Sequence, residues 1–269
     1  MRTKNFTGKV VVITGSSKGI GRESARAFAR AGAHVVLNGR DEKRLTALRD
    51  ELTGEGLSAG AFAADVTNAE DAEALVEHAS SLTGVIDVIV NNAGLSMRGP
   101  FEETSPEVIE AVTRVNILGA ALPTRYAIPY LKKSGGSVVF VSSLAGIRGF
   151  PGVAVYSSAK MALTAFSQAL RAELRGSGVH VGLIWVSFTE NDPDKQIYSA
   201  AGEPIRIERS WKTTQREVAT AILRLVVRRR NELAMTAQGK LFVLLNRLCP
   251  RLVRMIIHRS GGAVHRYRK

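Results

Sequence analysis

A glycine-rich turn between an apolar strand pattern and a helix pattern constrains the fold of this chain more than any other feature. The β-branched run Lys9–Thr14 leads into Gly15-Ser16-Ser17-Lys18-Gly19-Ile20-Gly21, where the amphipathic stretch Ile20–Ala31 begins. Glycine allows a tight turn and lets a phosphate group approach the backbone N–H groups at the positive end of the helix. Strand-to-helix turns also use glycine for steric reasons alone, so this turn predicts a phosphate cradle only together with further motifs.

Strand patterns and helix patterns alternate along the first 184 residues. Short apolar runs predict strands at Lys9–Thr14, His34–Asn38, Ser58–Ala63, Val85–Val90, Ser137–Ser142 and Val179–Ile184. Amphipathic stretches predict helices at Ile20–Ala31, Glu42–Leu52, Ala69–Leu82, Ser105–Leu131 and Val153–Arg175, the fourth as two helices that meet near Asn116. Helical crossovers between strands make a parallel sheet covered on both faces, so we expect a single α/β domain with a Rossmann-like, doubly wound sheet.

The regular pattern changes after Ile184. Residues 187–212, with Pro193, Gly202 and Pro204 among scattered charges, predict a lid made of loop and short helix. The pattern resumes with a predicted helix at Gln215–Arg229 and a predicted strand at Glu232–Thr236. We therefore divide the chain into a sheet domain at residues 1–236 and a C-terminal extension at residues 237–269.

The net charge of +13 belongs to the last quarter of the chain. Residues 1–204 hold 21 Lys and Arg against 21 Asp and Glu, whereas residues 205–269 hold 16 against 3. A neutral body with a basic tail indicates a local role for the tail and argues against a nucleic-acid surface over the whole fold.

Cysteine and apolar content bear on the compartment. A single cysteine, Cys249, cannot form an internal disulfide, which fits a reducing compartment. The first apolar stretch lacks the form of a signal peptide, and no apolar run approaches the roughly 20 residues of a membrane-spanning helix. We expect a cytoplasmic protein. The five histidines show no metal-ligand spacing, so no metal site is predicted; they are His34, His78, His180, His258 and His265.

Further motifs follow the strands in a fixed order. Asp65-Val66 comes after the third predicted strand, Asn91-Asn92-Ala93-Gly94 after the fourth and Ser143 after the fifth, with Tyr156-x-x-x-Lys160 in the next helix. Together with the glycine-rich turn, this set resembles the classical short-chain dehydrogenase/reductase family over roughly residues 8–184. The resemblance implies an oxidoreductase whose catalytic domain, here residues 1–236, binds a nicotinamide dinucleotide.

The end of the second strand indicates which dinucleotide. Gly39 stands where an acid would bind the adenosine ribose and select NAD, and Arg40 follows it. A guanidinium binds a 2′-phosphate well, and the resemblance implies a second cation there, Lys18. We therefore expect NADP(H). The cofactor contacts implied by the family pattern are Gly15, Ser17, Lys18, Gly19, Ile20, Gly21, Arg40, Asp65, Val66, Asn92, Ala93, Gly94, Tyr156, Lys160 and Asn191.

The catalytic set implied by the resemblance is Asn116, Ser143, Tyr156 and Lys160. Tyr156 and Lys160 lie four residues apart, on one face of a helix. A free phenol has a pKa near 10, and a nearby ammonium brings that pKa toward the working pH. Tyr156 would protonate the developing alkoxide, Ser143 would donate a hydrogen bond to the carbonyl oxygen, and Asn116 would support a water that links Lys160 to solvent.

One motif departs from the family pattern. Val186 and Ser187 replace the usual Pro-Gly after the sixth strand, and Asn191 replaces a cofactor-binding Thr. The path of this loop is therefore uncertain from the sequence. The candidate substrate contacts are Ser96–Arg98, Ile147–Phe150, Phe188, Tyr198 and Ile205. Most of these side chains are apolar or aromatic, which favours an apolar carbonyl compound as the substrate.

These observations predict an NADP(H)-dependent carbonyl reductase or alcohol dehydrogenase that acts on a hydrophobic ketone or secondary alcohol, such as a 3-oxoacyl, keto-sphingoid or steroid-like compound. A soluble 3-oxoacyl-carrier-protein reductase is an alternative, and a non-catalytic NADP-sensing binding protein is an alternative of another class. By resemblance, the helices around Asn116 and Tyr156 pair subunits, so a homodimer or homotetramer is expected.

The basic tail contains an amphipathic segment at Gly239–Arg259, which Pro250 divides. In a helix, Arg247, Arg251, Arg254 and His258 share one face and leave apolar side chains for the others, at Leu244, Leu248, Leu252, Met255 and Ile256. This pattern is typical of a helix that lies on an anionic membrane surface. Packing on the body or across an oligomer interface is the alternative. Nucleic acid is least favoured, because the basic residues from Arg247 onward have no stacking aromatic among them until Tyr267.

Overall fold

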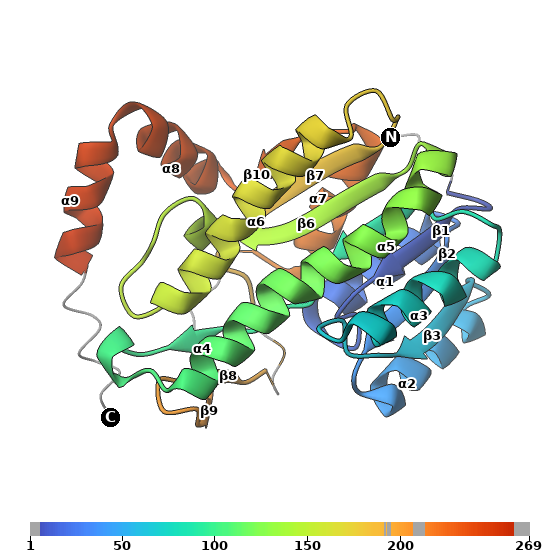
Figure 1. Ribbon diagram of the computed structural model, residues 1–269, viewed down its shortest axis with the longest axis horizontal. Coiled ribbons are helices and arrows are strands. Elements are labelled where there is room, and N and C mark those ends of the chain that lie inside the picture. The colour runs from blue at the N-terminus through green and yellow to red at the C-terminus, as the bar shows by residue number, and fades with distance from the viewer. Residues whose placement is uncertain (1–5, 191, 193–194, 207–212, 261–269) are drawn as a thin grey trace.

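A seven-stranded parallel sheet forms the centre of the molecule (Figure 1). The computed structural model describes residues 6–190, 192, 195–206 and 213–260. The strand order is β10-β7-β6-β4-β1-β2-β3, and every neighbouring pair is parallel. The strands are β1 (Val10–Ile13), β2 (His34–Gly39), β3 (Ala59–Ala63), β4 (Val88–Asn91), β6 (Ser137–Ser143), β7 (His180–Val186) and β10 (Glu232–Ala234). The predicted α/β, doubly wound fold is confirmed.

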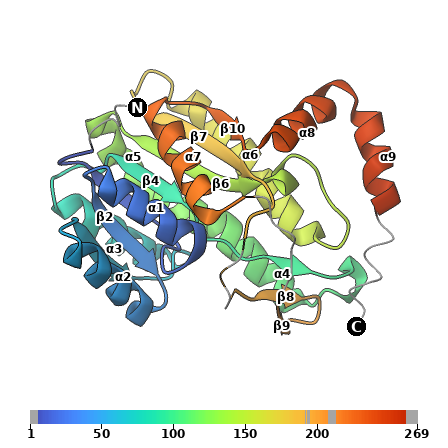
Figure 2. The same ribbon diagram turned by 180° about the vertical axis from the view of Figure 1, so that it is seen from behind.

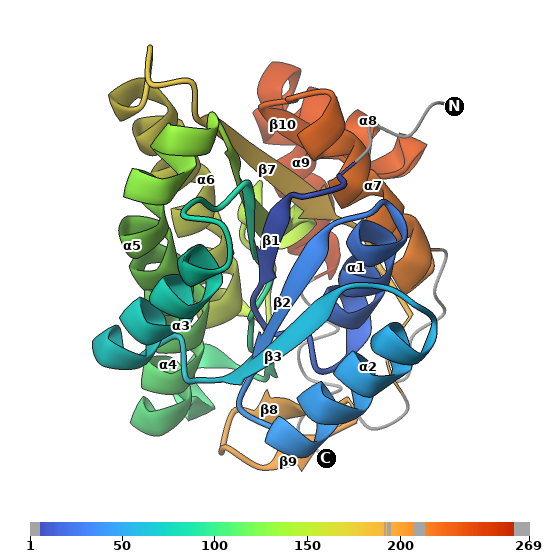
Figure 3. The same ribbon diagram turned by 90° about the vertical axis from the view of Figure 1, so that its right-hand side faces the viewer.

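Helices cover both faces of this sheet, as Figure 3 shows from its end. One face carries α1 (Gly19–Arg30), α2 (Glu42–Gly54) and α7 (Gln215–Val227). The other carries α3 (Ala69–Ser81), α5 (Gly119–Ser134) and α6 (Ala154–Glu173). Three polar side chains cap α2, α3 and α7 at their N-termini: Asp41, Asn68 and Thr214. Such caps satisfy backbone donors that a helix start would otherwise leave unpaired.

Alternation along β1 divides the core into two layers. Val11 and Ile13 face the layer of α1, α2 and α7, whereas Val10 and Val12 face the layer of α3, α5 and α6. A strand buried on both faces needs apolar residues at every position, which is why the strand patterns read as continuous runs. Phe140 of β6 is completely buried in the second layer.

The long helical segment between β4 and β6 divides as the sequence predicts. α4 (Pro106–Thr113) joins α5 through a π-helical turn at Arg114–Leu118, and Asn116 lies within that turn. A π-helical turn inserts an extra residue and is frequent at functional sites. α5 ends at Ser134, three residues beyond the predicted end, and contains Pro123 and Pro129.

A second, small sheet lies beside the carboxyl ends of the central strands. It consists of β5 (Met97–Arg98), β8 (Ile197–Ser199) and β9 (Pro204–Ile205). The described residues between 187 and 212 form these two short strands and no helix, so the expectation of a short helix there is wrong for that part of the chain. The strand β8 pairs with β5, a hundred residues earlier, and such long-range pairing leaves no local pattern in three residues.

Two C-terminal helices leave the body and are called the arm here, residues 237–260. α8 (Ala237–Leu248) and α9 (Pro250–Ser260) meet at an angle next to Cys249, and Figure 2 shows both at one side of the molecule. Pro250 is the first residue of α9, as predicted. No helix within the described ranges is long and apolar enough to cross a membrane.

Replacing Phe140 by Ala tests the core. We expect Phe140→Ala to lower the free energy of unfolding by about 3–5 kcal/mol, because the large cavity lies between two rigid layers. Phe101→Ala is the control, because Phe101 is 62% exposed. This substitution should change the free energy of unfolding by less than about 0.5 kcal/mol. Urea unfolding followed by fluorescence and circular dichroism gives both values. Equal effects of the two substitutions would contradict the assignment of the core.

Candidate active site

The turn after β1 forms a cradle that only glycine can line. Gly15 and Gly19 both have a φ of 63°, in the left-handed region. A Cβ on Gly21 would lie 2.2 Å from the carbonyl oxygen of Gly15 and 2.6 Å from Nδ2 of Asn92. The first turn of α1 has no acidic residue, and its N-cap, Lys18, makes no side-chain capping bond. No side chain of the described residues caps the first N–H groups of α1, so these groups can bind an anion such as a pyrophosphate.

The cradle is fastened to the loop that follows β4. Oγ1 of Thr14 accepts hydrogen bonds from the backbone N–H groups of Asn92 and Ala93, at 3.1 and 3.0 Å. In return, Nδ2 of Asn92 donates to the carbonyl oxygens of Thr14 and Gly15, both at 3.0 Å. Thr14 was absent from the predicted site, although a hydroxyl at a strand end is a readable signal. The structure thus brings together Gly15, Gly19, Gly21, Asn92 and Ala93.

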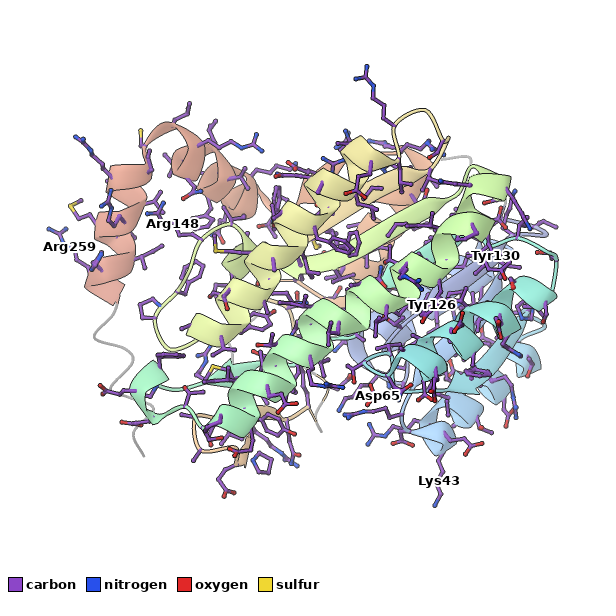
Figure 4. The ribbon with its side chains drawn as sticks, in the orientation of Figure 1. Lys43, Asp65, Tyr126, Tyr130, Arg148 and Arg259 are labelled. Atoms are coloured by element: carbon purple, nitrogen blue, oxygen red, sulfur yellow. The ribbon has the colours of Figure 1, made fainter. Side chains whose placement is uncertain are left out.

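The ends of β2 and β3 meet at one edge of this cradle. The Arg40 guanidinium is 3.9 Å from the carboxylate of Asp65, and the Arg40 side chain is 77% exposed (Asp65 is labelled in Figure 4). No acidic side chain stands at Gly39, where a Cβ would meet Oγ of Ser17 at 3.4 Å. Val66 is buried in the core layer of α3, α5 and α6. A cation that is mostly exposed can turn toward a phosphate placed beside it.

The predicted catalytic residues lie at the end of β6 and at the start of α6. Nζ of Lys160 lies 5.8 Å from the ring centre of Tyr156, in the neighbouring helical turn, and donates to the carbonyl oxygen of Val141 at 3.0 Å. Ser143, the last residue of β6, accepts a hydrogen bond from the N–H of Ala145 in the 3-10 turn Leu144–Gly146. Its own O–H has no acceptor within the described part of the chain, so it is able to donate to a substrate.

A hydrogen bond holds the two halves of this set in register. Oγ of Ser142 donates to the carbonyl oxygen of Lys160 at 3.1 Å. Gly146 makes this approach possible, because a Cβ there would lie 2.7 Å from the same carbonyl oxygen. The strand end that carries Ser143 is thus fixed against the helix that carries Tyr156 and Lys160.

Burial changes the acidity of Lys160. The side chain is 5% exposed, and burial lowers the pKa of its ammonium to about 8, with a smaller contribution from the charge of Lys195. Loss of hydration disfavours the charged form, which is why the pKa falls. The ammonium therefore changes its charge close to physiological pH.

Asn116 is part of the π-helical turn and, like Lys160, lies close to Gly94. Its Nδ2 donates to the carbonyl oxygens of Leu95 and Val112, at 2.7 and 2.8 Å. Its Oδ1 is buried and has no hydrogen-bond partner among the described residues. A Cβ on Gly94 would lie 3.1 Å from this Oδ1 and 3.3 Å from Nζ of Lys160, so glycine keeps the space between the two groups open. A water in that space would satisfy the unpaired oxygen.

An ion pair that sequence reasoning missed lies beside the cradle. Asp192 is nearly buried, and its Oδ1 is 2.9 Å from the guanidinium of Arg22 in α1. A Cβ on Gly19 would lie 3.2 Å from the other carboxylate oxygen. This pair fastens the segment after β7 to the cradle across 170 positions of sequence, a separation that no local pattern reveals. The neighbouring Asn191, a predicted cofactor contact, lies outside the described residues.

The predicted substrate contacts differ in their exposure. Met97 is 1% exposed and packs with Val108, Val112 and Val155, so it belongs to a small core that supports Tyr156 and is not a substrate contact. Phe188, by contrast, is 63% exposed. The loop after Ser143 contacts the arm: Phe150 stacks on Phe242 with ring centres 5.8 Å apart, and Arg148, labelled in Figure 4, donates to Asn246 at 3.0 Å.

The described residues contain no cluster of titratable side chains suited to a metal ion, since no group of three or more His, Cys, Asp or Glu among them could hold one. The ring of His180 hydrogen-bonds to the carbonyl oxygen of Arg230 at 2.9 Å, which is a structural contact.

Lys160 makes a testable contribution to stability. Its native pKa of about 8 is below the ordinary value of 10.5, so between these pH values the unfolded chain binds a proton that the native protein does not. The stability of the protein relative to a Lys160→Met variant should therefore rise with pH across this window, by up to about 1.4 kcal/mol per pH unit. Urea unfolding of both proteins from pH 7 to 10.5 measures it. A flat or falling difference would show that the buried amine keeps its ordinary pKa.

Comparisons with known proteins agree with this geometry. The family model described as short chain dehydrogenase matches residues 9–201. The ketoacyl reductase HetN of a Nostoc species is 33% identical over 231 residues, which cover 84% of this chain and 78% of that protein. A short-chain dehydrogenase/reductase from Burkholderia phymatum, solved in complex with NAD, has a TM-score of 0.81 and 26% identity, covering 92% of this chain and 96% of its own.

A second solved structure is an alcohol dehydrogenase from Thermococcus sibiricus complexed with 5-hydroxy-NADP, with a TM-score of 0.74, 29% identity and coverage of 84% of this chain and 95% of its own. The range that the family model matches, residues 9–201, contains the glycine cradle and the predicted set Ser143, Tyr156 and Lys160. The fold, the order of the motifs and these matches lead to one conclusion: the chain belongs to the short-chain dehydrogenase/reductase family of oxidoreductases.

Proposed function

We propose that this protein is an NADP(H)-dependent carbonyl reductase, or alcohol dehydrogenase in the reverse direction, for hydrophobic ketones and secondary alcohols. The observation that carries the proposal is the buried Lys160 beside Tyr156, at the end of the strand that presents Ser143 and next to a glycine cradle fit for a pyrophosphate. When bound, the nicotinamide supplies the hydride.

Each residue of the site has a defined part in carbonyl reduction. Ser143 donates a hydrogen bond to the carbonyl oxygen, which gains negative charge as the carbon accepts hydride. Tyr156 transfers its phenolic proton to that oxygen, so that an alcohol leaves and a phenolate remains. Lys160, when charged, stabilises the phenolate. A water held at Oδ1 of Asn116 would return a proton through Lys160 to Tyr156.

The preference for NADP(H) rests on the end of β2. The absence of a carboxylate at Gly39 removes a repulsion from a 2′-phosphate, and Arg40 and Lys18 offer two cations there. One solved relative is a complex with NAD and the other with an NADP analogue, so the family as a whole accommodates both. The choice in this chain therefore depends on these three residues.

An apolar substrate class is favoured by what surrounds the site. Phe188 is largely exposed, and Tyr198 packs against the same small core as Tyr156. These groups offer an organic ketone apolar contact and offer a phosphorylated sugar no fixed charge. The relative described as a ketoacyl reductase supports a 3-oxoacyl compound within this class. A carrier-protein-bound form of that substrate is the second candidate, favoured by the exposed cations of the C-terminal region, which an acidic carrier would complement.

Self-association is part of the proposal. Leu118, the last residue of the π-helical turn before α5, is 39% exposed, and Met161 of α6 is 43% exposed. Both belong to the helical segments that we expect to pair subunits. Burial of such side chains against a second copy would make a homodimer or homotetramer.

Tyr156→Phe tests the mechanism. We expect the variant to lose about 100- to 10,000-fold in kcat with a hydrophobic ketone, because it removes the proton donor. The binding of NADPH, followed by its fluorescence, should change little. Tyr130→Phe, on α5 beside Lys133, is the matched control and should keep full activity (both α5 tyrosines are labelled in Figure 4). Undiminished turnover by Tyr156→Phe would refute the mechanism, and NADPH binding without turnover of any ketone by the unaltered protein would favour a cofactor-sensing binding protein.

Gly39→Asp tests the cofactor preference. The new Cβ would make ordinary contacts, the nearest at 3.4 Å to Oγ of Ser17, so the fold should tolerate the change. The added carboxylate repels a 2′-phosphate and accepts hydrogen bonds from a free ribose hydroxyl. We expect kcat/KM with NADPH to fall about 10- to 100-fold, equivalent to about 1.4–2.8 kcal/mol, and kcat/KM with NADH to rise. Gly39→Ala controls for steric effects; if Gly39→Asp leaves the preference unchanged, the end of β2 does not select the cofactor.

A further inference from the structure

We propose that the arm, together with a basic groove at its base, is a docking surface for an anionic lipid bilayer. The inference goes beyond the proposed reaction, because it concerns a surface that takes no part in hydride transfer. Two independent features carry it: a row of exposed apolar side chains along α8 and α9, and a cluster of cations without acidic partners at the junction of α7, β10 and α8.

The first feature is a concentration of exposed apolar side chains on the arm. Six large apolar residues are 41–69% exposed within sixteen positions: Leu241, Leu244, Leu248, Leu252, Met255 and Ile256. Five other large apolar side chains of the described residues are 39–63% exposed, and they are scattered over residues 82–188. A concentration of exposed apolar side chains of this kind on a folded protein is typical of an interaction site or a membrane contact.

The arm exposes these residues because its other face is already used. Gly239 lies against Leu144 and Ser187 of the body, Phe242 stacks on Phe150, and Val243 packs on the core layer of α6. In α9, Val253 is 2% exposed. The exposed row is therefore apolar surface that remains after α8 has packed on the body.

The charge of the arm complements an anionic partner. After Glu232 the chain contains no Asp or Glu, while the described residues of the arm contain five cations, all exposed: Lys240, Arg247, Arg251, Arg254 and Arg259. Figure 4 labels Arg259, which points away from the body near the end of α9. Cations beside an apolar face suit a helix in the interface of a bilayer, where the apolar side chains enter the acyl boundary and the cations meet phosphate headgroups.

The second feature is a basic groove of about 660 Å³ between α7, β10 and the first turn of α8. Its lining includes five cations: Arg216, Arg224, Arg228, Arg230 and Lys240. The one acid of the lining, Glu217, is engaged in the capping box of Thr214. No ion pair joins these five cations to an acid of the described residues.

A buried hydroxyl in the same groove also lacks a partner. Oγ1 of Thr213, in a residue that is 3% exposed, makes no hydrogen bond within the described ranges. Unpaired cations and an unpaired hydroxyl around one groove fit the phosphate of a lipid headgroup. Lys240 belongs both to the groove and to the arm, so the headgroup site continues directly into the apolar row.

A bilayer fits this surface better than a second copy of the chain. Two copies meeting arm to arm would bring two sets of like charges together. The arm itself contains no acid, and Glu232 of the body, 3.2 Å from Arg247, balances only one cation of each set.

Docking on a bilayer would also hold the loop after Ser143 near the lipid phase. Arg148 of that loop contacts Asn246 of α8, and Phe150 contacts Phe242. An apolar ketone dissolved in the bilayer would then have a short path to the site.

Vesicle flotation of the full chain with NADPH bound tests the proposal. The vesicles consist of phosphatidylcholine alone, or of phosphatidylcholine mixed with phosphatidylglycerol. One variant changes the arm (Leu244→Glu, Leu248→Glu and Met255→Glu) and another changes the groove (Arg224→Glu and Arg228→Glu). Leu82→Glu, an exposed apolar position on the α3 side, and Arg175→Glu, an exposed cation after α6, are the matched controls.

We expect the unaltered protein and both controls to float with the anionic vesicles and not with the neutral ones. The arm variant should bind at least about 100-fold more weakly, since three apolar side chains no longer enter the bilayer. The groove variant should bind at least about tenfold more weakly, at roughly 1 kcal/mol per cation. Turnover of a short, water-soluble ketone, and the circular dichroism spectrum, should be unchanged in both variants and show that they are folded.

Three results would overturn the proposal. The unaltered protein could stay at the bottom of the gradient with anionic vesicles, or the arm variant could float as well as the unaltered protein. Light scattering could also show that the arm variant turns an oligomer into monomers while no vesicle binds, which would assign the apolar row to a second copy. Flotation is independent of catalysis, so loss of turnover in Tyr156→Phe leaves this test intact, and failure of flotation leaves the proposed reaction intact.

Discussion

The burial of one ammonium group, that of Lys160, governs the layout of the site. A buried lysine needs a hydrogen-bond acceptor close by, and the end of β6 supplies one through the carbonyl oxygen of Val141. Nζ also needs space, and Gly94 provides it, because a side chain there would come within 3.3 Å of the nitrogen. The low dielectric that lowers the pKa of the amine strengthens its effect on the adjacent phenol. Strand end, glycine and helix are thus arranged around a single charge.

The parts of the site that could be predicted are those whose partners are close in sequence or lie at strand ends. Tyr156 and Lys160 are one helical turn apart, and the glycines of the cradle follow one strand directly. The rule that parallel strands bring their carboxyl ends to one edge of a sheet places Asp65, Asn92 and Ser143 near them. The sequence predicts the division of the long helical pattern near Asn116, whereas it does not predict the π-helical form of the junction.

The parts that could not be predicted depend on pairing across long stretches of sequence. The contact between Arg22 and Asp192, and the pairing of β5 with β8, join segments that share no periodic pattern. Met97 looked like a substrate contact because it lies in a loop sequence, yet tertiary packing buries it under α4 and α6. The short strands that follow the Tyr156–Lys160 motif are the hardest to predict, because two or three residues carry almost no periodic signal.

The arm illustrates both cases, because part of its structure follows from the sequence and part depends on tertiary packing. Its sequence pattern is strongly amphipathic, but only the structure separates the apolar residues that pack on the body from those that remain exposed. A helix that merely covered the body would need one apolar face, and α8 has two: Phe242 and Val243 face inward, while Leu241, Leu244 and Leu248 do not. Because the inward face contacts the loop after Ser143, any partner that binds the outward face is held within a few residues of the catalytic strand end. If the arm docks as proposed, recruitment and substrate access would both depend on α8.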